Sequence, residues 1–163
     1  MKLYSRKKHR ISSSQKLLCV LFLIQFIVTS TVTADNNVIK FQHLTIENGL
    51  SQNSVLCVEQ DRRGFLWFGT EDGLNRYDGY SYKVFRNKPG DPNSLGYNHI
   101  ASILEDRSGR LWVGTIGGGV SIYNADKENF TVFMHDPEDN KSISDDSVYD
   151  IFEDKSGRIW IAT

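Results

Sequence analysis

Three aspartates stand at the same place in three similar segments, each followed by glycine three residues later and by tryptophan six residues later. The segments read D-R-R-G-F-L-W-F-G-T, D-R-S-G-R-L-W-V-G-T and D-K-S-G-R-I-W-I-A-T. Carboxylates that recur in this way could serve catalysis or bind calcium. They could equally accept hydrogen bonds from backbone N–H groups inside a tight turn. The recurring residues are Asp61, Gly64, Trp67, Asp106, Gly109, Trp112, Asp154, Gly157 and Trp160.

The repetition of these residues favours the turn over a site for chemistry, because every unit carries the same set. Each glycine can adopt the positive φ that closes a turn. Each tryptophan can pack as a large flat plate between neighbouring units, with an N–H group that needs one partner. We therefore interpret the nine residues as a structural repeat, and we predict no catalytic residue among them.

Other candidate sites have the wrong spacing for the chemistry that their residue types suggest. His43, His99 and His135 are too far apart in sequence for a zinc motif. The acidic residues between 136 and 146 lack the D-x-D-x-D-G order of a calcium loop. The glycines at 117–119 lack the Lys-Ser/Thr pair of a phosphate loop. We predict neither a metal nor a cofactor, and the sequence assigns no ligand-binding residue.

The elements that carry the three segments are predicted to be strands. The segments begin 45 and 48 residues apart, and aromatic and β-branched runs between them predict four short strands per unit. The second strand of each unit is apolar on both faces and needs cover on both sides. This period is typical of a β-propeller, although a β-sandwich remains the alternative. The predicted strands are 55–60, 65–69, 74–77, 82–85, 100–105, 111–114, 120–123, 130–133, 148–153 and 159–162.

The fold class predicted is therefore all-β, with propeller blades of four antiparallel strands and about two and a half blades in an incomplete ring. Residues 41–45 match the outer strands that contain Phe85 and Phe133, and we predict that they complete the last blade of a full ring. Because an open ring leaves blade faces uncovered, we expect the chain alone to aggregate or stay partly unfolded. The predicted divisions are an N-terminal segment at 35–53, repeat 1 at 54–98, repeat 2 at 99–146 and the start of repeat 3 at 147–163.

Residues 1–34 have the layout of a secretory signal. Six basic residues and no acid come first, and an apolar run at 17–28 follows. Small residues, including Val32 and Ala34, then favour cleavage before Asp35. The apolar run has 12 residues, whereas a membrane-spanning helix needs roughly 20, so an uncleaved anchor is the second interpretation. The sequence thus predicts an exported, periplasmic protein.

Removal of this segment changes the charge and the cysteine count. The remainder has 13 basic and 20 acidic residues, a net charge of −7, which disfavours binding to nucleic acid. It keeps Cys57 alone, so it can form no intrachain disulfide. Because Cys57 lies in the run V-L-C-V with no basic residue nearby, we expect a buried, unreactive thiol.

The segment from Ile100 carries a family resemblance. It reads I-A-S-I-L-E-D-R-S-G-R-L-W-V-G-T-I-G-G-G-V and resembles the two-component regulator propeller repeat, whose pattern is close to I-x-x-I-x-E-D-x-x-G-x-L-W-[IV]-G-T-x-x-G-G-[LV]. The resemblance covers nearly all of 41–163. In that family, such propellers form the exported sensory part of hybrid histidine kinases, often in receptors for oligosaccharides.

The resemblance implies an extracytoplasmic ligand-binding region of a two-component receptor in the inner membrane. Its implied partners are the remaining propeller blades, the membrane and kinase parts of the receptor, and an oligosaccharide ligand. The chain has neither a histidine-phosphorylation motif nor a nucleotide-binding glycine box. We therefore predict that the chain itself is not an enzyme.

Two polar loops at 86–98 and 134–146 are the candidate binding surfaces, the first with Tyr97. They could form a carbohydrate or partner surface, or serve as ordinary connections between blades. Two other function classes remain: a propeller enzyme that acts on carbohydrate, and a structural protein-interaction propeller. The repeating character of the polar residues argues against the enzyme.

Overall fold

The computed structural model describes residues 39–163. The chain divides into two compact units, Met1–Phe41 and Gln42–Thr163, and every described strand lies in the second unit. The predicted signal, residues 1–34, falls outside the described residues. Among the residues that are described, none belongs to a helix with the length and apolar character needed to cross a bilayer.

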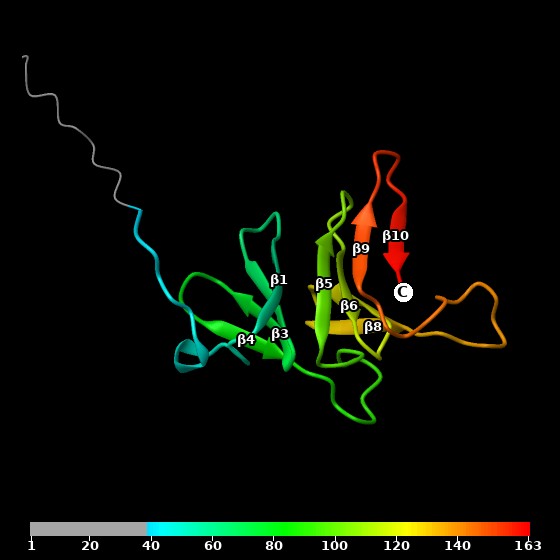
Figure 1. The fold of residues 1–163 in the computed structure, drawn as a ribbon, viewed down its shortest axis with the longest axis horizontal. Coiled ribbons are helices and arrows are strands. Elements are labelled where there is room, and N and C mark those ends of the chain that lie inside the picture. Colours follow the sequence, from blue (N-terminus) through cyan, green and yellow to red (C-terminus); the bar gives the residue numbers. More distant parts are fainter. Residues whose placement is uncertain (1–38) are drawn as a thin grey trace, which may run out of the picture. The chain divides into compact units, whose positions relative to one another are not determined.

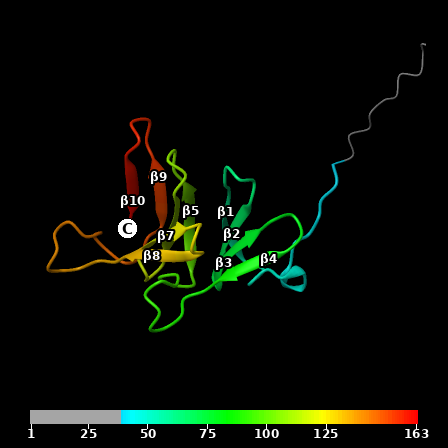
Figure 2. The same ribbon diagram turned by 180° about the vertical axis from the view of Figure 1, so that it is seen from behind.

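Within residues 39–163, ten strands form two four-stranded antiparallel sheets and one hairpin, and each four-stranded sheet is a blade (Figure 1). Spatial order follows chain order within each blade, and the first strands of successive blades contact one another. Figure 2 shows the same arrangement from behind. The elements are η1 (Ile46–Asn48), β1 (Val55–Gln60), β2 (Leu66–Thr70), β3 (Gly73–Tyr77), β4 (Tyr82–Phe85), β5 (Ile100–Glu105), β6 (Leu111–Thr115), β7 (Val120–Asn124), β8 (Asn129–Phe133), β9 (Asp150–Glu153) and β10 (Ile159–Ala162).

The two complete blades share their irregularities as well as their strands. In each blade the pairing of the first two strands shifts register at the same place, between Val55 and Cys57 in β1 and between Ile100 and Ser102 in β5. Such a bulge bends a strand and increases its twist. The repeat therefore extends to the hydrogen-bonding pattern of each blade.

The sequence predicted the strands well. Four of the ten have the predicted bounds, and five others differ by one residue at one or both ends. The exception is β9, which begins at Asp150 rather than at Val148. The Val148 N–H donates to the Thr115 carbonyl of the preceding blade at 2.9 Å, and the Val148 side chain is fully buried. Val148 therefore joins two blades before the hairpin begins.

The N-terminal segment contains no strand among its described residues. Residues 41–45, which the sequence predicted as an outer strand, have no regular structure, and the short helix η1 follows them. Leu50 and Ser51 do join the first blade, because Leu50 is buried and the Ser51 N–H donates to the Asn75 side chain at 2.8 Å. The role of 41–45 in closing a ring stays a prediction.

The core lies between the blades and is centred on Trp67. This side chain is fully buried, and its ring lies 5.9 Å from Phe85 of its own blade and 4.9 Å from Tyr123 of the next. Phe130 completes the cluster at 5.6 Å from Phe85. Truncation of such a residue typically costs about 3–5 kcal/mol. The prediction that this tryptophan packs as a plate between blades is confirmed for Trp67.

The three repeated tryptophans differ in cover. Trp112 packs against the second apolar cluster, which contains Val148 and Ile151 and joins the second blade to the hairpin. Trp160 is 58 % exposed, because no strand in the described part of the chain lies over β10. Burial of the indole thus depends on a following blade.

A close approach between blades explains the glycine before the threonine in two of the repeated segments. A Cβ on Gly69 would lie 2.8 Å from Ile100 Cγ2, and a Cβ on Gly114 would lie 2.8 Å from Val148 Cγ1. In both cases the contacted residue belongs to the first-strand region of the next blade. The glycine therefore sets how closely consecutive blades pack.

Gly114→Ala should destabilise the protein by about 1–3 kcal/mol, because the added methyl group meets the buried Val148 side chain. In a Val148→Ala background the same change should be close to neutral, since the obstructing methyl group is gone. Urea denaturation of the four proteins of this cycle measures the coupling. If the losses in free energy of unfolding of the two single variants sum to that of the double variant within about 0.5 kcal/mol, the proposed contact is contradicted.

Candidate functional site

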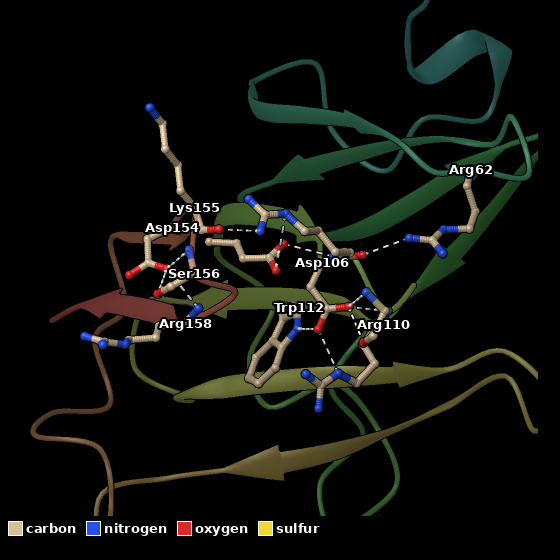
Figure 3. A network of polar contacts seen from close by, with 11 residues as sticks. Arg62, Asp106, Arg110, Trp112, Asp154, Lys155, Ser156 and Arg158 are labelled. Atoms are coloured by element: carbon tan, nitrogen blue, oxygen red, sulfur yellow. Dashed lines mark hydrogen bonds and ion pairs between the residues drawn. The ribbon is translucent and has the colours of Figure 1, made fainter.

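The repeated aspartate organises a tight turn and holds the tryptophan at the same time. Asp106 Oδ1 accepts hydrogen bonds from the backbone N–H groups of Ser108 and Arg110, at 2.9 and 3.0 Å. Asp106 Oδ2 accepts from the Trp112 indole N–H at 2.8 Å and from Arg110 Nε at 2.7 Å (Figure 3). Both oxygens of this buried carboxylate are therefore in use.

The other two turns repeat this geometry. Asp61 Oδ2 accepts from the Trp67 indole at 2.9 Å, and Asp154 Oδ2 accepts from the Trp160 indole at 2.9 Å. In each turn the Oδ1 atom accepts from the backbone N–H groups two and four residues further on. The glycine of each turn has positive φ, at 90° for Gly64, 86° for Gly109 and 83° for Gly157.

These hydrogen bonds favour the ionised forms of Asp106 and Asp154. Burial raises the pKa of Asp106, but the hydrogen bonds from Ser108, Trp112 and Arg110 outweigh burial and hold that pKa well below its usual range. The Ser156 hydroxyl and then the Trp160 indole lower the pKa of Asp154. A carboxylate stabilised in this way is a poor proton acceptor, which disfavours a role as general base.

A second interaction, which the sequence analysis missed, joins each turn to the next blade. The Arg62 backbone N–H donates to Glu105 Oε2 at 2.8 Å, and Arg62 Nε pairs with Glu105 Oε1 at 3.0 Å. Arg62 Nη2 also donates to the Asp106 carbonyl at 2.9 Å. One arginine of the first blade thus holds both the carboxylate and the backbone of the neighbouring turn.

The same clamp recurs one blade later. The Arg107 backbone N–H donates to Glu153 Oε2 at 2.9 Å, and Arg107 Nη1 donates to the Lys155 carbonyl at 2.9 Å. The signal for it was present in the sequence as an acid before the repeated aspartate and a base after it. Gln60 departs from that pattern at the first turn, and the base of the third turn is Lys155 in place of arginine.

The structure does not bring the repeated aspartates together. Each one is bound within its own turn, so the three form no shared carboxylate site. Among residues 39–163 no group of three or more His, Cys, Asp or Glu side chains is arranged to hold a metal ion.

The two candidate loops share one hydrogen-bonded frame. In the first, Ser94 Oγ accepts from the Lys88 N–H at 2.9 Å and Asn98 Oδ1 accepts from the Asn87 N–H at 2.7 Å. In the second, Ser142 and Asp146 make the corresponding bonds at 2.9 and 2.7 Å. This frame is scaffold, so ligand specificity in these loops has to come from the side chains that differ between them.

Cys57 lies in β1, where it pairs with Gly69 of the second strand, β2. A Cβ on Gly69 would fall 2.4 Å from its sulfur. Burial raises the pKa of the Cys57 thiol to about 11, although a backbone hydrogen bond with Gly69 lowers it in part. The thiol is therefore protonated at neutral pH, as a structural cysteine requires.

Comparison with known proteins places these repeats. The family described as "Two component regulator propeller" matches residues 49–72, 94–117 and 142–163. A curated relative, "Histidine kinase P4" of Formosa agariphila, is 44 % identical over 73 residues, which are 45 % of this chain and 5 % of the relative.

Two solved structures are similar to the fold. One is the extracellular domain of the hybrid two component system BT3049 from B. thetaiotaomicron, with a TM-score of 0.69 and 33 % identity. The other is that of BT4673 from the same organism, with a TM-score of 0.59 and 26 % identity. The alignments cover 75 % and 77 % of this chain and 17 % of each of those chains. The chain thus spans a small part of the length of its relatives.

Asp106→Asn should lower the free energy of unfolding by about 2–4 kcal/mol at pH 7, because an amide cannot accept all five hydrogen bonds that the carboxylate receives. The native pKa of Asp106 is depressed, so its stabilisation is present above the unfolded pKa of about 3.9 and is lost as the pH falls below it. Urea denaturation at pH 7 and pH 3 should therefore show a smaller difference at pH 3. Asp126→Asn is the control, because the Asp126 side chain lies on a hairpin and has no hydrogen bond to the described residues. It should change the free energy of unfolding by no more than about 0.5 kcal/mol.

Cys57 should resist thiol reagents in the folded protein. In a Cys19→Ser background, which leaves Cys57 as the one thiol, labelling at pH 8 should be slow without denaturant and rapid in urea. Absorbance of the released chromophore measures both rates. Equal rates in the two conditions would show an accessible thiolate and contradict the partial burial of Cys57.

Proposed function

Because the chain is built from two-component regulator propeller repeats, we propose that it is the extracellular sensory region of a two-component receptor and that its ligand is an oligosaccharide. The observation that carries this proposal is the likeness of its blades to the extracellular domain of a hybrid two component system, at 33 % identity. The histidine kinase relative agrees with a role in signalling.

The geometry of the turns supports recognition rather than catalysis. The repeated carboxylates are used in holding turns and tryptophans, and the Arg–Glu clamps are used in joining blades. Polar side chains that differ between the repeats are therefore the groups left for binding. In the full receptor a membrane segment and a kinase core would convert that binding into a signal.

The proposed receptor also requires export. Residues 1–34 serve in this proposal as the secretory signal, and the propeller lies in the periplasm or outside the cell. We assign repeat 1 to 54–98, repeat 2 to 99–146 and the start of repeat 3 to 147–163. The partners in the receptor are further blades and the membrane and kinase parts.

Isothermal titration of the full-length protein with a set of oligosaccharides tests the proposed ligand class. At least one oligosaccharide should bind saturably, and at 100 times its Kd it should stabilise the folded state by about 2.7 kcal/mol. Its constituent monosaccharide is the matched control and should bind more weakly. Absence of binding by every oligosaccharide would favour a structural interaction propeller instead.

A further inference from the structure

A pocket of about 520 Å³ lies between the outer strands of the first two blades. Its walls come from β4, from the start of β8 and from the loop at 86–98, and we call it the inter-blade pocket. The volume falls within the ~300–1,000 Å³ range of small-molecule sites. The Phe130 N–H donates to the Asn93 carbonyl at 2.9 Å, so the loop is fixed against the second blade.

The charge of the inter-blade pocket is opposite to that of the protein. Its lining has two acids, Asp91 and Glu128, and four cations, which are Lys83, Arg86, Lys88 and Lys127. Two of the cations are neutralised, Lys83 by Glu128 and Arg86 by Asp72. Lys88 and Lys127 form no ion pair with any residue of 39–163. The inter-blade pocket thus presents two unpaired ammonium groups and one unpaired carboxylate, that of Asp91, and its lining carries an excess of positive charge.

These cations are absent from the corresponding positions of the next repeat. Alignment on Phe85 and Phe133 places Thr131, Met134 and Asp136 where Lys83, Arg86 and Lys88 stand in the first repeat. The frame of the loop is common to both repeats, whereas the charge is not. Residues that depart from a repeat without serving its scaffold are candidates for ligand recognition.

One wall of the inter-blade pocket is held by a backbone conformation that glutamate rarely adopts. Glu128 has a φ of 51°, in the left-handed region, and it is the one non-glycine residue with positive φ among those described. Its carboxylate pairs with Arg76 at 3.0 Å and also with Lys83, both from the first blade. Such a conformation persists only where surrounding contacts enforce it. The two pairs therefore fix the pocket wall to the neighbouring blade.

The rest of the lining suits a saccharide. Phe85 and Phe130 lie beneath the floor, but both side chains are nearly buried in the core cluster and leave little ring surface for a ligand. The side-chain amides of Asn93 and Asn129 make no hydrogen bond within the described residues, so they are free to bind hydroxyl groups. The lysines add donors for an anionic substituent.

We propose that the inter-blade pocket binds an acidic saccharide, whose carboxylate or sulfate group lies between Lys88 and Lys127. This proposal rests on the oligosaccharide ligand proposed above and narrows it to anionic members. The neutral parts of the ligand contact the amides of Asn93 and Asn129, and the anionic group provides the selectivity.

Isothermal titration of the full-length protein with paired trisaccharides tests the pocket. Each uronic or sulfated trisaccharide is compared with the neutral trisaccharide of the same sugar and linkage, and inorganic sulfate is titrated alone. At least one acidic member should bind more than tenfold tighter than its neutral partner. The Lys88→Gln/Lys127→Gln variant should remove that difference, whereas Lys155→Gln, on a turn outside the pocket, should keep it.

The two classes of acidic ligand are separated by which member of the set binds, uronic or sulfated. Thermal unfolding of the double variant should match that of the parent, because neither ammonium group has a partner in the described structure. Equal affinity for acidic and neutral members, an unchanged double variant, or inorganic sulfate that binds as tightly as the saccharide would each overturn the proposal. A neutral oligosaccharide that binds the parent and the double variant with equal affinity would contradict the proposed site in the inter-blade pocket. The proposed function as an oligosaccharide receptor would then still hold.

Discussion

Each repeat has one carboxylate that must satisfy a turn and an indole together. In the second blade Asp106 accepts from two backbone N–H groups with one oxygen and from Trp112 with the other. A buried indole N–H without an acceptor would be costly, and so would a buried carboxylate without donors. The two groups therefore require one another, and the tight turn is what brings them within reach. The tryptophan orientation fixed in this way sets the surface on which the next blade packs.

The blade interface adds two constraints to that surface. The glycine two residues after the tryptophan, within the same strand, allows the next blade to approach, as at Gly114 against Val148. The arginine after the repeated aspartate then joins the glutamate of the next turn, as Arg62 does with Glu105. The clamp is directional, because the second repeat contributes its acid, Glu105, to the preceding blade and its base, Arg107, to the following one. Exposed ion pairs contribute little to the free energy of unfolding by themselves. The clamp therefore serves mainly to align each blade with the next.

The scaffold was largely predictable from the sequence because its signals are local and repeated. The turn residues and strand bounds follow from spacing and residue type, and the structure places most strands within one residue of expectation. The start of β9 was misplaced because Val148 bonds to a different blade, which no local pattern reveals. The acceptor of the indole N–H was also missed, although its aspartate had been singled out. The clamp was missed for a related reason, since its two residues stand 43 positions apart.

Departures from the repeat carry the information that the scaffold does not. Gln60 breaks the clamp pattern at the first turn and Lys155 takes the place of arginine at the third, and in both cases the partner blade is not among the described residues. Lys88 breaks the pattern elsewhere, at a position where the second repeat has Asp136 and where no scaffold bond uses the side chain. Lys88 and Lys127 line one pocket because the two blades that carry them are neighbours. In a fold that multiplies one unit, selection for binding can act only where a unit differs from its copies, and the inter-blade pocket is such a place.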